Sequence, residues 1–139
     1  LQNYGEVLIE RFIPGREIQV AIMGKKVIGA IELRPRRKFY DYEAKYNPKA
    51  KTEHIIPVQI DNDSLKKVYS IALNAHKKLK CRGVTRSDFR YYNNKFYLLE
   101  LNTQPGMTTQ SLVPEISSYM NIEFINLIEK ILEDASINK

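Results

Sequence analysis

The sequence predicts an α+β fold whose sheet is largely antiparallel, with flanking helices and one long mobile loop. Short segments rich in β-branched and aromatic residues come in pairs separated by turn-forming residues, which is the pattern of β-hairpins. Apolar residues at helical spacing occur after these pairs. Because a hairpin pairs neighbouring strands in opposite directions, this order predicts helices packed on an antiparallel sheet.

The expected strands are bounded by Gly, Pro or Asn. The first one, residues 7–13, ends at Pro14-Gly15, and the hairpin that follows turns at residues 24–26. A second hairpin turns at Asn93-Asn94. The arms of the first hairpin are residues 17–23 and 27–33, a short strand is expected at 54–58, and the arms of the second hairpin are 84–92 and 96–102.

Three helices are expected. The first is N-capped by residues 61–63, because Asp and Asn side chains accept hydrogen bonds from the first helical turn, and it ends at Arg82-Gly83. A short helix begins at about Leu112, and a third helix follows it. The residues expected to face inward are Leu65, Val68, Ile71, Ala72, Ala75 and Leu79 in the first helix and Ile122, Ile125, Ile128, Ile131 and Leu132 in the last.

Composition limits the functional classes. A chain of 139 residues forms one domain, or one domain and part of another. The single cysteine, Cys81, excludes an internal disulfide, and no apolar run approaches the roughly 20 residues that span a bilayer, which fits a cytoplasmic protein. The net charge of +6 suits a nucleic acid or a nucleoside triphosphate as partner. It is equally consistent with a genome whose proteins are generally rich in lysine.

Asp88, Glu100 and Asn102 have the chemistry of a metal site, because carboxylate and amide oxygens are the hard ligands that Mg²⁺ takes. Glu100 and Asn102 lie two residues apart on a strand and share one face. A two-residue turn alone would put Asp88 on the wrong face, whereas a three-residue loop or a bulge of equal effect puts it opposite Glu100. We predict the longer turn or the bulge, which also puts Arg86 opposite Asn102.

Spacing alone leaves a second interpretation open. The acidic residues could form the solvated face of a hairpin, with Arg86 as their ion-pair partner. If a metal is bound, Arg86 becomes a cation close to developing negative charge, which acyl-phosphate and tetrahedral intermediates require.

Two longer motifs make the interpretation specific. Residues 39–46, within the basic and aromatic loop of residues 34–52, read Phe-Tyr-Asp-Tyr-Glu-Ala-Lys-Tyr. The second hairpin continues into Leu-Leu-Glu-Leu-Asn-Thr-Gln-Pro-Gly-Met-Thr over residues 98–108 and Ser-Leu-Val-Pro over 111–114. Together with Arg-Ser-Asp-Phe at 86–89, these motifs resemble the C-terminal part of the D-alanine–D-alanine ligases, members of the ATP-grasp superfamily.

The resemblance implies a site for ATP. The backbone of Glu10, Arg11, Phe12 and Ile13 would meet the adenine edge, with Glu10 taking the exocyclic amine. Glu17 would hold the ribose hydroxyls, since a carboxylate accepts two donors from a diol. Phe39 and Leu99 would pack against the adenine, although either could equally be a core residue. Lys45 would reach a phosphate, and Tyr40 is also implied to bind ATP.

The resemblance also implies that Asp88, Glu100 and Asn102 hold Mg²⁺ or Mn²⁺, usually two ions that bridge the ATP phosphates. Arg86 would stabilise the acyl phosphate and the tetrahedral intermediate.

Four further residues are implied around the amino-acid substrate. The backbone N–H of Gly106 would be a second oxyanion donor. The Ser111 hydroxyl and the Leu112 N–H would bind the carboxylate of the second D-alanine at the positive end of a helix. Tyr46 would join the substrate-side hydrogen bonds when the loop closes.

The implied reaction makes D-alanyl-D-alanine for peptidoglycan. The carboxylate of one D-alanine attacks the γ-phosphate of ATP, and the amine of a second D-alanine displaces phosphate from the acyl phosphate.

Residues 1–16 would be a hinge strand from the central ATP-grasp subdomain and residues 17–139 the C-terminal domain. Because the first-substrate site and two phosphate-binding lysines would lie upstream, we predict that these residues alone do not ligate. A full-length homodimer with no nucleic-acid or membrane partner is expected.

Two alternatives stay open. One is a relative that joins D-alanine to D-lactate or D-serine, although Lys45-Tyr46 favours the dipeptide because such relatives tend to have a rebuilt loop. The other is a basic nucleic-acid-binding module, because aromatic residues are interleaved with Arg36, Arg37 and Lys38 and bases stack on such residues.

Overall fold

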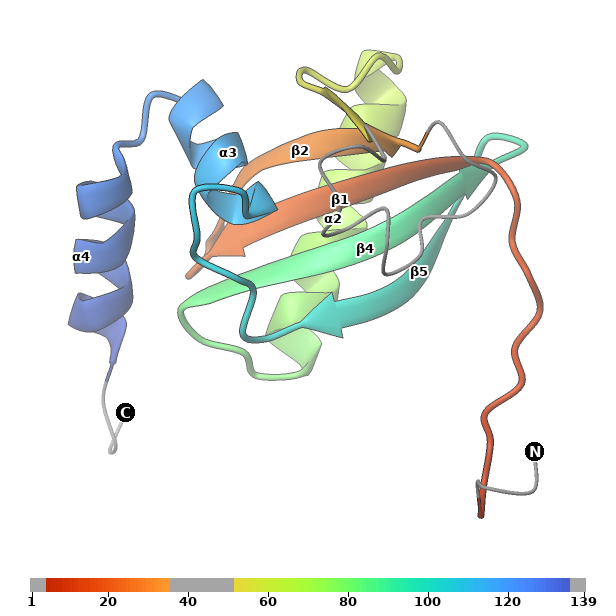
Figure 1. Cartoon of the computed structure of the whole chain (residues 1–139), viewed down its shortest axis with the longest axis horizontal. Coiled ribbons are helices and arrows are strands. Elements are labelled where there is room, and N and C mark those ends of the chain that lie inside the picture. Colours follow the sequence, from red (N-terminus) through yellow and green to blue (C-terminus); the bar gives the residue numbers. More distant parts are fainter. Residues whose placement is uncertain (1–4, 36–51, 136–139) are drawn as a thin grey trace.

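One antiparallel sheet forms the frame of the molecule. The computed structural model describes residues 5–35 and 52–135. Within these residues, five strands lie in the order β3-β2-β1-β4-β5 (Figure 1). Every strand pairing is antiparallel, so the predicted α+β fold is confirmed. The strands are β1 (Arg16–Met23), β2 (Lys26–Arg34), β3 (Glu53–Ile55), β4 (Val84–Tyr92) and β5 (Lys95–Asn102).

The described helices cover both faces of the sheet. They are α2 (Asn62–Lys78), α3 (Leu112–Tyr119) and α4 (Phe124–Asp134). Helix α2 lies across one face, whereas α3 packs on β2 at the other face and α4 packs against α3 (Figure 1). Successive strand residues point to opposite faces, so Val20 joins the core under α2 and Ala21 joins the core under α3. The α3 core occupies only part of its face, because polar residues take the rest.

Helix α2 begins as predicted and ends early. The Ser64 backbone N–H donates a hydrogen bond of 2.8 Å to Asp61 Oδ1, and hydrogen bonding by the Ser64 side chain and backbone lowers the pKa of the Asp61 carboxyl. The helix ends at Lys78 and not at Arg82-Gly83, because Lys80 has a φ of 53° and a left-handed residue cannot continue a right-handed helix.

Two strand predictions need correction. Residues 7–13 form no strand, and they extend away from the sheet (Figure 1) with Leu8 and Ile9 86% and 87% exposed. A strand needs a partner for its backbone N–H and C=O groups, and no described strand lies beside this segment. The short strand expected at 54–58 is β3, which is shifted because only residues 53–55 pair with β2.

The inward faces of the helices are also only partly as predicted. Val68 is buried in α2, but Leu79 lies beyond the helix end and is exposed. In α4 the buried residue is Leu127, while Ile125 and Leu132 face solvent. The reason is that α4 packs on α3 along a narrow stripe and not flat on the sheet. In the described part of the chain, no helix has the length and apolar character that crossing a bilayer requires.

Candidate functional site

The β4–β5 register places the predicted metal ligands together. Tyr92 pairs with Lys95 across a two-residue turn, and both turn residues, Asn93 and Asn94, have positive φ, as a type I′ turn requires. The strands then shift register between Asp88 and the next residue of β4. The turn is therefore not the three-residue loop, and the alternative that we predicted, a bulge of equal effect, is confirmed.

The bulge has the expected consequence. Phe89 pairs with Leu98 and Asp88 pairs with Glu100, so Leu99 is the extra residue of β5. Arg86 pairs with Asn102. Directly paired residues of an antiparallel sheet share a face, so the predicted ligands and the arginine lie on the same face.

This face continues onto β1. Glu17 of β1 pairs with Arg90 of β4, and Gln19 of β1 pairs with Asp88 of β4. Because the two residues on each strand are two apart, all four side chains lie on the same face. We call the resulting row of side chains the polar strip, which consists of Glu17, Gln19, Arg86, Asp88, Arg90, Glu100 and Asn102. Sequence reasoning missed Gln19 and Arg90. The signal was present, because residues two apart on a strand share a face and Gln19 follows Glu17 as Arg90 follows Asp88.

Arg86 and Asp88 form a tight, nearly buried ion pair. The Arg86 Nε and Nη2 atoms donate to the two carboxylate oxygens of Asp88 at 2.7 and 2.8 Å. Their side chains are 14% and 12% exposed. A second acid, Glu100, lies 3.8 Å from Arg86 Nη2, and its side chain is 61% exposed. The arginine is thus held between two carboxylates at the centre of the polar strip.

The oxygen atoms of the polar strip fit a hard divalent cation. Both oxygens of Asp88 accept hydrogen bonds from Arg86, but each carboxylate oxygen keeps a further lone pair. The Oδ1 atom of Asn102 accepts one hydrogen bond, 2.9 Å from the Gln104 backbone N–H, and also keeps a lone pair. The described residues contain no group of three His, Cys, Asp or Glu side chains placed to hold a metal. An ion here would rely on the Asn102 amide and on ligand or water oxygens, which is how Mg²⁺ is usually held.

A second cluster surrounds the start of α3. The Ser111 Oγ atom accepts a hydrogen bond of 3.0 Å from the Thr108 backbone N–H, and it lies 2.9 Å from Thr108 Oγ1. A Cβ atom added at Gly106 would lie 2.8 Å from Ser111 Oγ, so any side chain at this position would displace the Ser111 hydroxyl. Ser111 is the N-cap of α3 without a side-chain cap bond, and Leu112 begins the helix with its side chain buried. The three predicted residues are therefore adjacent, at the positive end of a helix.

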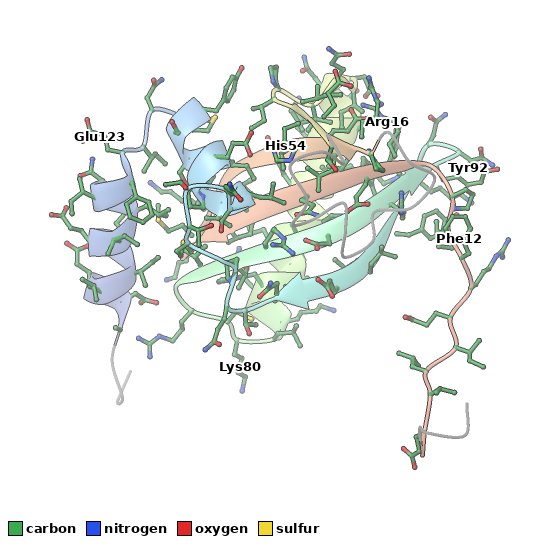
Figure 2. The ribbon with its side chains drawn as sticks, in the orientation of Figure 1. Phe12, Arg16, His54, Lys80, Tyr92 and Glu123 are labelled. Atoms are coloured by element: carbon green, nitrogen blue, oxygen red, sulfur yellow. The ribbon has the colours of Figure 1, made fainter. Side chains whose placement is uncertain are left out.

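The remaining predicted residues are not gathered at the polar strip. Glu10 and Arg11 are exposed, Phe12 is 61% exposed, and Ile13 is half-buried, in the segment that leaves the sheet. Figure 2 shows Phe12 on this segment, close to where it meets the sheet near Tyr92. The predicted adenine contact Leu99 is half-exposed on β5 as the bulge residue. The loop residues Phe39, Tyr40, Lys45 and Tyr46, and the basic run Arg36, Arg37 and Lys38, lie outside the described residues.

Known proteins are similar to this chain over most or all of its length. Residues 1–133 match the family described as the D-ala D-ala ligase C-terminus. The D-alanine–D-alanine ligase of Pelagibacter ubique (strain HTCC1062) is 66% identical over 139 residues, which are 100% of this chain and 46% of that protein. The ligase of Xanthobacter autotrophicus is 45% identical over 142 residues, which cover 98% of this chain and 46% of that protein.

Solved structures agree. The Bacillus anthracis D-alanine–D-alanine ligase complexed with ATP matches with a TM-score of 0.76 and 27% identity, over 90% of this chain and 39% of that one. Another structure of the B. anthracis ligase matches with a TM-score of 0.77 and 32% identity, over 90% of this chain and 40% of that one. The chain thus spans about half the length of the curated relatives it matches. With its ATP-grasp fold and with the family match over residues 1–133, the chain belongs to the D-alanine–D-alanine ligase C-terminus family.

Proposed function

We propose that this chain is the C-terminal part of an enzyme that joins two D-alanine molecules using ATP, with ADP, phosphate and D-alanyl-D-alanine as products. In the proposed protein, residues 1–16 belong to a hinge strand and residues 17–139 form the C-terminal ATP-grasp domain. The high identity to a ligase over the full length of the chain supports the proposal. The whole protein would be a homodimer.

The observation that carries this function is the register of β4 and β5. It sets Asp88 opposite Glu100 and Arg86 opposite Asn102, so that three side chains with oxygen atoms and one guanidinium share a single face. Mg²⁺ or Mn²⁺ at these oxygens would neutralise charge on the ATP phosphates. Arg86 contributes a fixed positive charge beside the same phosphates, where negative charge develops during acyl transfer.

The other residues have binding roles in the proposed reaction. Glu17, at the opposite end of the polar strip, would hold the ribose of ATP. Ser111 and the first N–H groups of α3 would hold the carboxylate of the second D-alanine, and the Gly106 N–H would stabilise the oxyanion. Catalysis then consists mainly of positioning the two substrates and neutralising charge, as in other phosphoryl transfers.

A chimeric ligase tests the proposal. This chain replaces the matching C-terminal part of the Pelagibacter ubique relative, and release of ADP and of D-alanyl-D-alanine is measured. We expect the chimera to be active, and the 139-residue chain alone to be inactive. Glu100→Gln should lower kcat/KM by at least about tenfold, because a metal ligand is weakened. The matched control is Glu129→Gln, an exposed glutamate on α4, which should leave the rate unchanged.

Three results would contradict the proposal. They are an inactive chimera that is folded, a full rate in the Glu100→Gln variant, and dipeptide formation by the chain alone. A chimera that uses D-lactate or D-serine in preference to the second D-alanine would assign the chain to that group of relatives instead.

A further inference from the structure

The carboxylate of Glu17 is held at both of its oxygens. Gln19 Nε2 donates to Oε1 at 3.3 Å, and Arg90 Nη2 lies 3.5 Å from Oε2. The Glu17 and Arg90 side chains are only 12% and 18% exposed, and Gln19 is 2% exposed. Glu17 and Arg90 are directly paired across β1 and β4, so the strand register itself brings their side chains into contact.

Arg90 also fixes the backbone that leads into β1. Its Nη1 atom donates to the Gly15 carbonyl oxygen at 3.1 Å. Gly15 has a φ of 105°, and a Cβ atom there would lie 2.3 Å from the Tyr91 carbonyl oxygen, so the chain lies directly against β4 at this point. One guanidinium therefore holds the entry to β1 and the Glu17 carboxylate together.

One polar atom of the Gln19 side-chain amide is unsatisfied. Its Oε1 atom is buried and has no hydrogen-bond partner among the described residues. Exchanging its two amide atoms would set an oxygen against the Glu17 carboxylate, so the contact with Glu17 fixes which atom is Oε1. Buried acceptors are nearly always satisfied, so this atom indicates that a donor from outside the described residues completes the site.

We propose that Arg90 and Gln19 are positioning residues that hold the Glu17 carboxylate ready for the ribose hydroxyls of ATP, and so make the site select ribonucleotides over 2′-deoxyribonucleotides. The inference rests on the proposed function, in which Glu17 binds the ribose. A carboxylate oxygen can accept more than one hydrogen bond, so the Glu17 carboxylate can bind a ribose diol while Arg90 and Gln19 orient it. A carboxylate that is already oriented loses less conformational freedom on binding, and this raises affinity for a ligand that uses both oxygens.

The test is the ratio of affinities for ATP and 2′-deoxy-ATP, measured by calorimetry on the chimeric ligase. We expect roughly a tenfold preference for ATP in the unmodified chimera, since a hydrogen bond to a charged acceptor is lost with the 2′-hydroxyl. Arg90→Met should reduce this preference below about threefold and raise KM for ATP, with kcat at saturating ATP unchanged. Arg90→Lys keeps the charge and should retain part of the preference.

Two further variants separate this role from general effects. Gln19→Met, which has a similar volume, should also reduce the preference, and it serves if Arg90→Met does not fold. Lys95→Met removes one positive charge from an exposed position at the same end of the sheet. It should weaken the two nucleotides equally and leave their ratio unchanged.

The outcomes are decisive in both directions. An unmodified chimera without a preference for ATP overturns the inference, as does a preference that survives both Arg90→Met and Gln19→Met. A preference that rises in Arg90→Met also overturns it, because Arg90 would then compete with the ribose for Glu17. Dipeptide formation is measured separately, so a chimera that ligates but shows no ribose preference rejects this inference alone, and one that binds no ATP rejects both.

Discussion

At the scale of single residues, β4 carries two arginines that hold carboxylates in different ways. Arg86 binds Asp88 on its own strand through two short hydrogen bonds, whereas Arg90 reaches across to Glu17 on β1. An uncompensated carboxylate in the place of Asp88 would be costly, because breaking a buried ion pair on one side costs about 3–5 kcal/mol. The arginines therefore make it possible to keep acids on a largely buried face.

Gly106 gives the sharpest prediction at this scale. Gly106→Ala would place a Cβ atom 2.8 Å from Ser111 Oγ and push the hydroxyl out of position. We expect kcat/KM for D-alanine in the chimeric ligase to fall about tenfold to 100-fold, because a misplaced binding group costs rate steeply. The control is Asn126→Ala, at an exposed position of α4. Unchanged D-alanine kinetics in Gly106→Ala would contradict the role of this loop.

At the scale of elements, local chemistry decided what could be predicted from the sequence. The Asn93-Asn94 turn and the alternation of Glu100 and Asn102 are local, so the hairpin and the shared face of its ligands could be predicted. Residues 7–13 have the composition of a strand, but strand formation depends on a distant partner that composition does not reveal.

The pairings between strands that are distant in the sequence could not be predicted. The Glu17–Arg90 and Gln19–Asp88 pairs depend on how β1 aligns with β4, which no local motif specifies. The inward face of α4 was likewise only partly predicted: Ile122 and Ile131 pack against the core, whereas Ile125 and Leu132 are exposed.

The contact between α2 and β4 predicts a pH dependence of stability. His76 is 2% exposed, and its Nδ1 atom lies 2.8 Å from Thr85 Oγ1. Burial lowers the pKa of His76 below the usual 6.5, although the charge of Asp134 opposes this shift. The unfolded state therefore binds the proton more tightly than the folded state does, and protonation favours unfolding.

We expect this contribution to be fully present above about pH 6.5 and to be lost as the pH falls through the folded pKa, with a slope of at most about 1.4 kcal/mol per pH unit. Urea unfolding at a series of pH values measures it. Subtracting the curve of a His76→Gln variant removes the contribution of carboxylates that titrate lower. Parallel curves for the two proteins between pH 5 and 7 would contradict the assignment.

At the scale of the whole molecule, the two faces of the sheet differ in character. Apolar residues under α2 form one core, and the opposite face is shared between the α3 core and the polar strip. The segment before β1 belongs to neither face, and it exposes Val7, Leu8 and Ile9 to solvent. In the proposed ligase this segment is the hinge strand, whose backbone would pair with the preceding part of the protein.

Hydrogen exchange measures this difference. In the 139-residue chain we expect the amides of residues 7–13 to exchange rapidly, because the described structure gives them no strand partner. In the chimeric ligase the same amides should be protected by strand pairing, at least about 100-fold. The amides of β1 are the internal reference, since they pair with β2 and β4 in the sheet. Equal exchange of residues 7–13 in both proteins would show that the segment is not a strand in the longer protein either.

The alternation along β4 has a consequence for how this chain can be diversified. Ser87 and Phe89 lie on the α2 side of β4, whereas Arg86, Asp88 and Arg90 belong to the polar strip. Adjacent residues of this strand therefore serve either the packing under α2 or the candidate site. A mutagenesis library that varies only the even positions of this stretch would change the ligand contacts, and its members would have to keep or replace the Arg86–Asp88 and Arg90–Glu17 ion pairs to stay folded. One that varies only the odd positions would sample scaffolds of different stability behind an unaltered site.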